Sequence, residues 1–349
     1  GVIITFINVY VENSYMKNNY KNFNFLNYIA AVILVILCIV QIVPDTSVKA
    51  KTAENTGDIT EIHTAAELVK ASENQTGSYR LMADIDMTGI DWTPWDFSGK
   101  FDGNGYTILN LSVTKTNRRT MKTYDGNRKE YDTYGAGLFG ILSNADVSGL
   151  NIKGARIEVA TNNHCFAAPI AGLCNNSNIS DCIISDSYVS LTDSAKMWGT
   201  GGIAGFGSGN LDNVSTDVTL VCIDTDKQVK DEQFMGGAYA AGFLNIRNCK
   251  INIDGYDSDH GYVHDGGLVG MYMVYPYDLS LTYAGEVLNN EVYGQITFYE
   301  DNTDRRAYCK ANMGEVMNWT YAYSGFKYDF DANETFDYSV TLLLSLIHI

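Results

Sequence analysis

This sequence has little proline and little positive charge. Only four of its 349 residues are Pro, and 24 Lys and Arg stand against 41 Asp and Glu, which gives a formal net charge of -17. The shortage of cations argues against nucleic acid or an anionic membrane surface as the main partner. Charged residues make up only 19% of the chain and apolar residues 46%, a composition typical of a folded protein with a large core.

Turn-forming and strand-forming residues are abundant instead. The chain contains 32 Gly and 24 Tyr, together with many Asn, Thr, Val and Ile. Glycine and asparagine favour tight turns, whereas tyrosine and β-branched residues favour strands. The composition therefore predicts an all-β protein built of many short strands.

An apolar run from Tyr28 to Val43 lies near the N-terminus, between a basic segment that contains Met16 and a polar segment. This is the layout of a secretory signal. We expect a signal peptide over residues 16–50, cleaved after Ala50, with residues 1–15 as translated upstream sequence. A run of this length can also stay in the bilayer as an uncleaved anchor. In both cases the remainder is expected to be exported.

The exported part contains a repeated pattern, apolar-x-x-apolar-x-apolar. It occurs five times and once more in degenerate form, with first residues Ile108, Val147, Ile179, Leu211, Ile246 and Val287. The steps between copies are 39, 32, 32, 35 and 41 residues. A constant minimum step with a few longer ones is typical of a solenoid with loop insertions. Since the alternation has period two, the repeats are strands and not helices.

The residue before the second apolar position of each copy tolerates a positive φ angle. These residues are Asn110, Gly149, Asp181, Asn213, Asn248 and Asn289. Each repeat is therefore expected to turn a sharp corner there, and the corners are expected to stack. The apolar positions that follow would form one inward ladder, consisting of Leu111, Leu150, Cys182, Val214, Cys249 and Asn290.

A glycine anchor precedes each corner. The anchors are Gly137-Leu-Phe-Gly140, Pro169-Ile-Ala-Gly172, Gly202-Ile-Ala-Gly205, Ala238-Tyr-Ala-Ala-Gly242 and Gly267-Leu-Val-Gly270. On these anchors, and on the segment from Tyr79 to Val113, the chain resembles proteins that carry the GLUG repeat. The resemblance covers Ile62 to about Ile296. It implies a right-handed parallel β-helix in a bacterial surface or secreted protein.

These observations together divide the exported chain. Residues 51–77 are expected to form a linker and a short N-terminal capping helix, with Thr64 as its N-cap. Residues 78–300 are expected to form the β-helix, residues 301–340 an irregular Tyr-rich β segment, and residues 341–349 a read-through tail. On this interpretation the chain is a fragment of a longer protein.

Six cysteines lie in the exported part, and an even count in an exported protein suggests disulfides. Cys182 and Cys249 are two repeats apart, or about 9.6 Å at a strand spacing of about 4.8 Å, which exceeds the limit of about 7 Å between bridged Cα atoms. They are therefore predicted to be buried thiols. Cys165 and Cys174 flank one glycine anchor, and whether they pair stays open.

The densest group of possible metal ligands contains Asp257, Asp259, His260 and His264. Two His four residues apart bind zinc when a helix places them on one face, but the flanking glycines predict a loop. We expect a solvated loop, with a metal site as the alternative. Some proteins with the GLUG repeat are metallopeptidases, but this sequence contains no His-Glu-x-x-His, so the resemblance transfers no catalytic residue. No cofactor is expected.

A basic excursion occupies residues 115–134. Removing residues 1–50 leaves 21 basic residues, and six of them lie here: Lys115, Arg118, Arg119, Lys122, Arg128 and Lys129. Asp125-Gly126-Asn127 is a hairpin-turn signal, so the excursion is predicted to be a two-stranded flap. Its cations either pair with the protein's own carboxylates or bind an anionic glycan or another surface protein.

We therefore expect a non-enzymatic, monomeric bacterial surface β-helix that acts as an adhesion or display module. It is expected to have no nucleic-acid partner and to contact a membrane only through an uncleaved N-terminal segment. The alternatives are a carbohydrate-active enzyme, either a polysaccharide lyase or a hydrolase, and a non-catalytic part of a larger surface peptidase. The fold alone does not decide between these functions.

Overall fold

The computed structural model describes residues 59–124, 130–193, 197–225, 232–257, 262–272, 286–298 and 336–341. These residues belong to one compact unit, Gly57–Ile349. The predicted signal segment, most of residues 301–340 and the end of the chain lie outside the described residues. Within the described ranges no helix is long and apolar enough to cross a membrane.

Strands form most of the described structure, and α3 (Ala65–Ala71) is the one helix among the described residues. The N-terminal strands are β1 (Thr60–Ile62), β2 (Thr76–Leu81), β3 (Ile85–Asp86), β4 (Trp95–Asp102), β5 (Thr107–Leu109), β6 (Ser112–Val113), β7 (Met121–Tyr124) and β8 (Glu130–Ala136). The next are β9 (Phe139–Ser143), β10 (Asp146–Ser148), β11 (Asn151–Lys153), β12 (Arg156–Thr161), β13 (Cys165–Ala167), β14 (Ala171–Ser180) and β15 (Ile183–Asp193). Then follow β16 (Met197–Gly201), β17 (Ala204–Asp212), β18 (Ser215–Asp224), β19 (Glu232–Gly236), β20 (Tyr239–Arg247), β21 (Lys250–Asp257), β22 (Tyr262–Gly266), β23 (Val269–Tyr272), β24 (Glu286–Phe298) and β25 (Phe336–Thr341).

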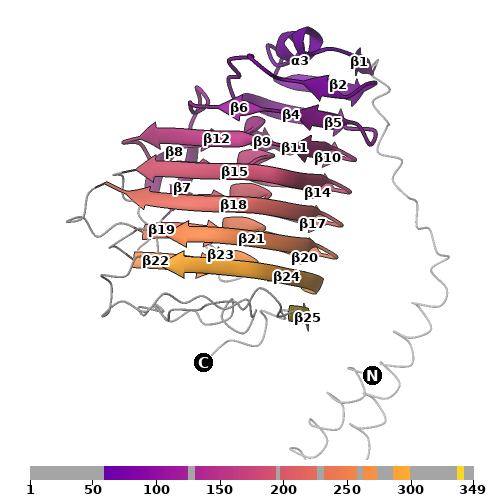
Figure 1. The fold of residues 1–349 in the computed structure, drawn as a ribbon. Coiled ribbons are helices and arrows are strands. Elements are labelled where there is room, and N and C mark those ends of the chain that lie inside the picture. The colour runs from indigo at the N-terminus through magenta and orange to yellow at the C-terminus, as the bar shows by residue number, and fades with distance from the viewer. Residues whose placement is uncertain are drawn as a thin grey trace, which may run out of the picture. The chain divides into compact units, whose positions relative to one another are not determined.

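These strands form a 19-stranded sheet and a six-stranded sheet. Every pairing is parallel except β7 with β8 and β24 with β25. Each strand pairs with its equivalent one repeat later, so that β12, β15, β18, β21 and β24 lie stacked in that order (Figure 1). We call one repeat's set of strands a layer. The all-β fold class is therefore confirmed, with parallel sheets and one short helix.

Helix α3 lies where the sequence predicts it. Thr64 is its N-cap and forms a capping box with Glu67, in which each side chain accepts a hydrogen bond from the other residue's backbone N–H. The helix buries Leu68 and Ala71 against the first strands. This short helix thus contributes apolar side chains to the N-terminal end of the core.

The corners have the predicted backbone geometry. Asp181 and Asn213 each have φ of 55°, Asn248 has 56° and Gly149 has 61°. Backbone hydrogen bonds join each corner to the next, as from the Gly149 N–H to the Ser180 oxygen at 3.1 Å. The inward ladder from Leu150 through Cys182 to Asn290 also stacks in register.

The predicted register of the first repeat was wrong. Ile108 pairs with Ile152 and not with Val147, so Asn110 stacks on Gly154, and Leu111 stacks on Ala155 outside the Leu150 ladder. The layers that contain β5, β11 and β15 have a second corner, at Asn110, Gly154 and Asp186, all with positive φ. The same apolar pattern surrounds both corners, which is why the sequence pattern selected the wrong one.

The glycine anchors place two backbones in close contact. Strand pairing aligns Gly140, Gly172, Gly205, Ala240 and Gly270 in one row. A Cβ atom at Gly172 would lie 2.3 Å from the Ala136 nitrogen in the six-stranded sheet. The fourth anchor is therefore shifted from its predicted position, because Ala240 and not Gly242 occupies this row.

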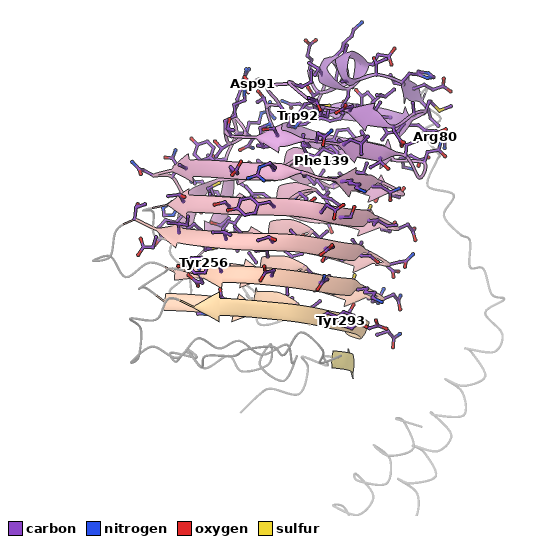
Figure 2. All side chains as sticks on the ribbon, viewed as in Figure 1. Arg80, Asp91, Trp92, Phe139, Tyr256 and Tyr293 are labelled. Atoms are coloured by element: carbon purple, nitrogen blue, oxygen red, sulfur yellow. The ribbon has the colours of Figure 1, made fainter. Side chains whose placement is uncertain are left out.

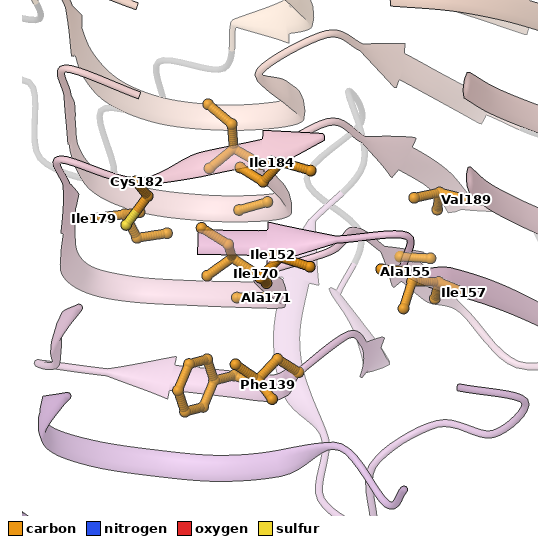
Figure 3. Packing of buried hydrophobic residues seen from close by; sticks show 14 of the residues in the cluster. Phe139, Ile152, Ala155, Ile157, Ile170, Ala171, Ile179, Cys182, Ile184 and Val189 are labelled. Carbon is orange, nitrogen blue, oxygen red and sulfur yellow. The ribbon is translucent and has the colours of Figure 1, made fainter. Parts of the chain in front are cut away.

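One large apolar cluster fills the interior, with Ile152, Ile184 and Cys182 among its members (Figure 3). A second, smaller cluster contains Phe166 and Phe234 of the six-stranded sheet. The five described cysteines are buried thiols that form no disulfide, so Cys165 and Cys174 are not paired with each other.

Candidate functional site

The basic excursion forms the predicted two-stranded hairpin. β7 runs antiparallel to β8, with Met121 opposite Thr133 and Tyr124 opposite Glu130. β8 in turn pairs in parallel with β13, so the hairpin is the end of the six-stranded sheet. Arg128 and Lys129, which were predicted to contribute to the site, lie outside the described residues.

Buried polar contacts fix the hairpin to the body of the protein. The Thr123 and Thr133 hydroxyls lie 2.6 Å apart, and both residues are fully buried. Asn117, at the base of the hairpin, exchanges hydrogen bonds with the Gly135 backbone, and its Nδ2 donates to Oδ1 of Asp96 at 2.5 Å. The hairpin is thus held on one face and is not a freely projecting flap.

Two of the six cations of the basic excursion are paired with the protein's own carboxylates. Lys122 Nζ lies 3.0 Å from both Glu130 and Asp132, and these carboxylates raise the pKa of Lys122. Lys115 Nζ lies 2.7 Å from Asp91. For these two lysines the structure agrees with the first alternative, that the cations pair with the protein's own carboxylates.

Arg118 and Arg119 differ from these lysines. Both are exposed, and neither forms an ion pair within the part of the chain that the structure describes. Burial raises the pKa of Asp96, and the charge of nearby Arg119 opposes that effect. Two adjacent guanidinium groups therefore remain available at the base of a fixed hairpin.

The predicted metal cluster is not brought together in the described residues. Asp257 ends β21 and is buried, and His264 lies on strand β22 and not in the expected loop. The His264 ring stacks on Phe234, with centroids 5.0 Å apart, and burial lowers its pKa to about 4. His260 and Asp259 lie outside the described residues. Among the residues placed, no group of three His, Cys, Asp or Glu could hold a metal ion.

The structure also contains rows of outward amides that the apolar pattern could not reveal. Asn178 donates from Nδ2 to Oδ1 of Asp146 at 2.6 Å, and Asn210 donates to Asn178 at 2.5 Å. Each step between these residues is 32 positions, equal to the repeat. A search for polar residues at the repeat spacing would therefore have found them.

Comparisons with known proteins identify no family. No family model matches the chain, and no curated protein matches it. A crystal structure from Bacteroides ovatus, described provisionally as an immunoglobulin A1 protease, is similar at 16% identity over 74% of this chain and 86% of that chain. Its TM-score of 0.39 is too low to carry an argument about fold or function.

Proposed function

We propose that the chain is a right-handed parallel β-helix that acts as a non-enzymatic adhesion or display module of an exported bacterial surface protein. The solenoid proposal is supported by the register of the sheets, in which Ile179 pairs with Leu211 and Leu211 with Ile246. Right-handed winding is the general preference for connections between parallel strands. Stacked repeats of this kind create long, regular surfaces suited to binding.

The observation that carries the function is the pair of exposed guanidinium groups on Arg118 and Arg119. The described residues of the basic excursion, 115–124 and 130–134, have four cations, Lys115, Arg118, Arg119 and Lys122, and two anions, Glu130 and Asp132, hence a local charge of 4 - 2 = +2. The whole chain has a net charge of -17. An anionic glycan or an acidic surface protein would therefore meet its most favourable potential here, and planar guanidinium groups bind carboxylate or sulfate in bidentate fashion.

The test compares two variants with the same loss of charge. In Arg118→Ser/Arg119→Ser the exposed pair is removed. In the control, Lys153→Ser/Arg156→Ser, two cations that pair with Asp186 and Glu158 are removed from strands β11 and β12 of the 19-stranded sheet. Retention on alginate and heparin columns is measured at low and high salt, because screening weakens contacts between exposed charges.

The hairpin variant is expected to lose salt-sensitive retention, whereas the control keeps it and both melt at the temperature of the unmodified protein. Retention of the hairpin variant equal to that of the control would contradict the proposal. Turnover of alginate or pectin by the purified protein would instead favour the carbohydrate-active enzyme.

A further inference from the structure

A second surface lies on the outward side of β2, β4, β10, β14, β17 and β20. Strand pairing arranges its side chains in two rows that cross the layers. The first row is Ser78, Lys100, Asp146, Asn178, Asn210 and Asn245, and the second is Arg80, Asp102, Ser148, Ser180, Asp212 and Arg247. We call these twelve residues the amide face. Arg80 marks its N-terminal end in Figure 2.

The amides of the first row are ordered by hydrogen bonds that all run in one direction. Asn178 donates to Asp146 at 2.6 Å, Asn210 to Asn178 at 2.5 Å and Asn245 to Asn210 at 2.6 Å. Each amide plane is therefore fixed before any partner arrives. A partner that binds such a preorganised row loses little side-chain entropy.

These contacts do not exhaust the hydrogen-bonding capacity of the row. An Asn side chain has two N–H donors and a carbonyl oxygen with two lone pairs. Asn178 uses one donor, toward Asp146, and one lone pair, from Asn210. Asn178 is exposed and Asn210 is half-buried, so their other donors and lone pairs face the surface.

The face is electrically balanced, although the chain is strongly acidic. It carries three cations, Lys100, Arg80 and Arg247, and three anions, Asp146, Asp102 and Asp212. Arg80 and Asp102 also form an ion pair at 2.7 Å. A polyanion gains no net attraction here and is repelled by the remainder of a chain of charge -17, whereas a polycation finds stronger attraction elsewhere.

A neutral polyhydroxylated chain matches these properties. Its hydroxyl groups both donate and accept, as the remaining donors and lone pairs of Asn178 and Asn210 do. The amides recur at about 4.8 Å, the distance between neighbouring strands. One chain that crosses several layers would therefore form the same contact repeatedly, and weak individual contacts would add through multivalency.

We propose that the amide face binds a neutral polysaccharide laid across the layers. This surface is separate from the basic hairpin, and it extends the proposed adhesive function to a second ligand class. Binding here depends on hydrogen bonds between uncharged groups, so it is expected to persist at high salt.

The experiment uses the full chain and affinity gels that contain a neutral β-glucan or a neutral α-mannan. Asn178→Ala/Asn210→Ala removes two amides from the face. The matched control, Asn151→Ala/Asn252→Ala, removes two amides from the neighbouring outward rows, where they donate to Gly105 and Asp217. A third variant, Ser180→Arg, leaves the amides in place and obstructs the second row.

The unmodified protein is expected to be retarded by at least one neutral glycan equally at low and high salt. The amide-face and Ser180→Arg variants are expected to bind about tenfold more weakly, which corresponds to about 1.4 kcal/mol, and the control to bind as the unmodified protein does. Absence of binding to both neutral glycans, or equal weakening by the control, would overturn the inference. Either result leaves the salt-sensitive hairpin proposal untouched, because that proposal is tested on anionic columns.

Discussion

Asn213 donates a hydrogen bond from Nδ2 to Oδ1 of Asp181 at 2.7 Å, and both residues have φ of 55°. They occupy the same corner in successive layers, so this one contact reports both the backbone turn and the stacking. Asn and Asp tolerate the left-handed conformation better than other residues with a Cβ atom, and their short polar side chains can reach the next layer. Glycine, as at Gly149, adopts the left-handed conformation easily but has no side chain that could reach the next layer.

Substitution of Asn213 separates these two contributions. Asn213→Val is expected to lower the free energy of unfolding by about 2–3 kcal/mol, because valine is strained at positive φ and the hydrogen bond is lost. Asn213→Gly keeps the backbone angle and is expected to cost only about 1 kcal/mol. Thr219→Val, at an outward strand position, is expected to change the free energy of unfolding by less than about 0.5 kcal/mol. Urea unfolding measures all three, and equal effects of the valine and glycine variants at Asn213 would exclude backbone strain as the cause.

The glycine row is expected to resist even one added methyl group. In Gly172→Ala the new Cβ would lie 2.3 Å from the Ala136 nitrogen and 2.4 Å from the Gly135 Cα, so the two sheets must separate. Overpacking of this kind costs about 1–3 kcal/mol. The control is Ala240→Gly in the same row. It removes a methyl group and does not force any side-chain atom against the opposite backbone. Thermal melts should show the larger loss for Gly172→Ala, and the opposite order would contradict the close approach.

Buried thiols give a chemical test of the core. Burial raises the pKa of Cys182 and of Cys249 to about 12, so both remain protonated and unreactive at neutral and mildly alkaline pH. Iodoacetamide is therefore expected to leave these two residues unmodified in the native protein and to modify them after denaturation. Mass spectrometry of the peptides measures this, and rapid native labelling of either residue would place it outside the core.

The corners could be predicted from sequence because positive φ restricts residue type. Asp181, Asn213 and Asn248 were found for that reason, and each has the expected angle. The first repeat could not be aligned, because Asn110 lies at a second corner with the same local pattern. Only the pairing of Ile108 with Ile152 distinguishes the two corners, and such long-range pairing has no local signature in one sequence.

The candidate site was predictable only in part. The hairpin followed from a turn signal between two short strand patterns. Which cations are paired could not be known, since Lys115 reaches Asp91, 24 positions away, and the aligned strands place Lys122 beside Asp132. His264 was assigned to a loop because glycines flank it, although tertiary pairing with Phe234 places it on a strand.

The pH dependence of stability should contain a contribution from His264. Burial against Phe234 lowers its pKa from 6.5 to about 4, so the folded state favours the neutral ring. Above pH 6.5 neither state is protonated at this residue, and its stabilising contribution is fully present. As the pH falls from 6.5 toward about 4, the unfolded state binds a proton that the folded state does not, and stability is lost. His264→Phe keeps an aromatic ring against Phe234 without a titrating group, so its urea midpoint should fall less over this interval than that of the unmodified protein. His63→Phe, at an exposed histidine, should retain the full loss. If the His264→Phe variant loses as much stability as the other two proteins, the ring is already protonated in the folded state and its half-buried position stacked on Phe234 is wrong.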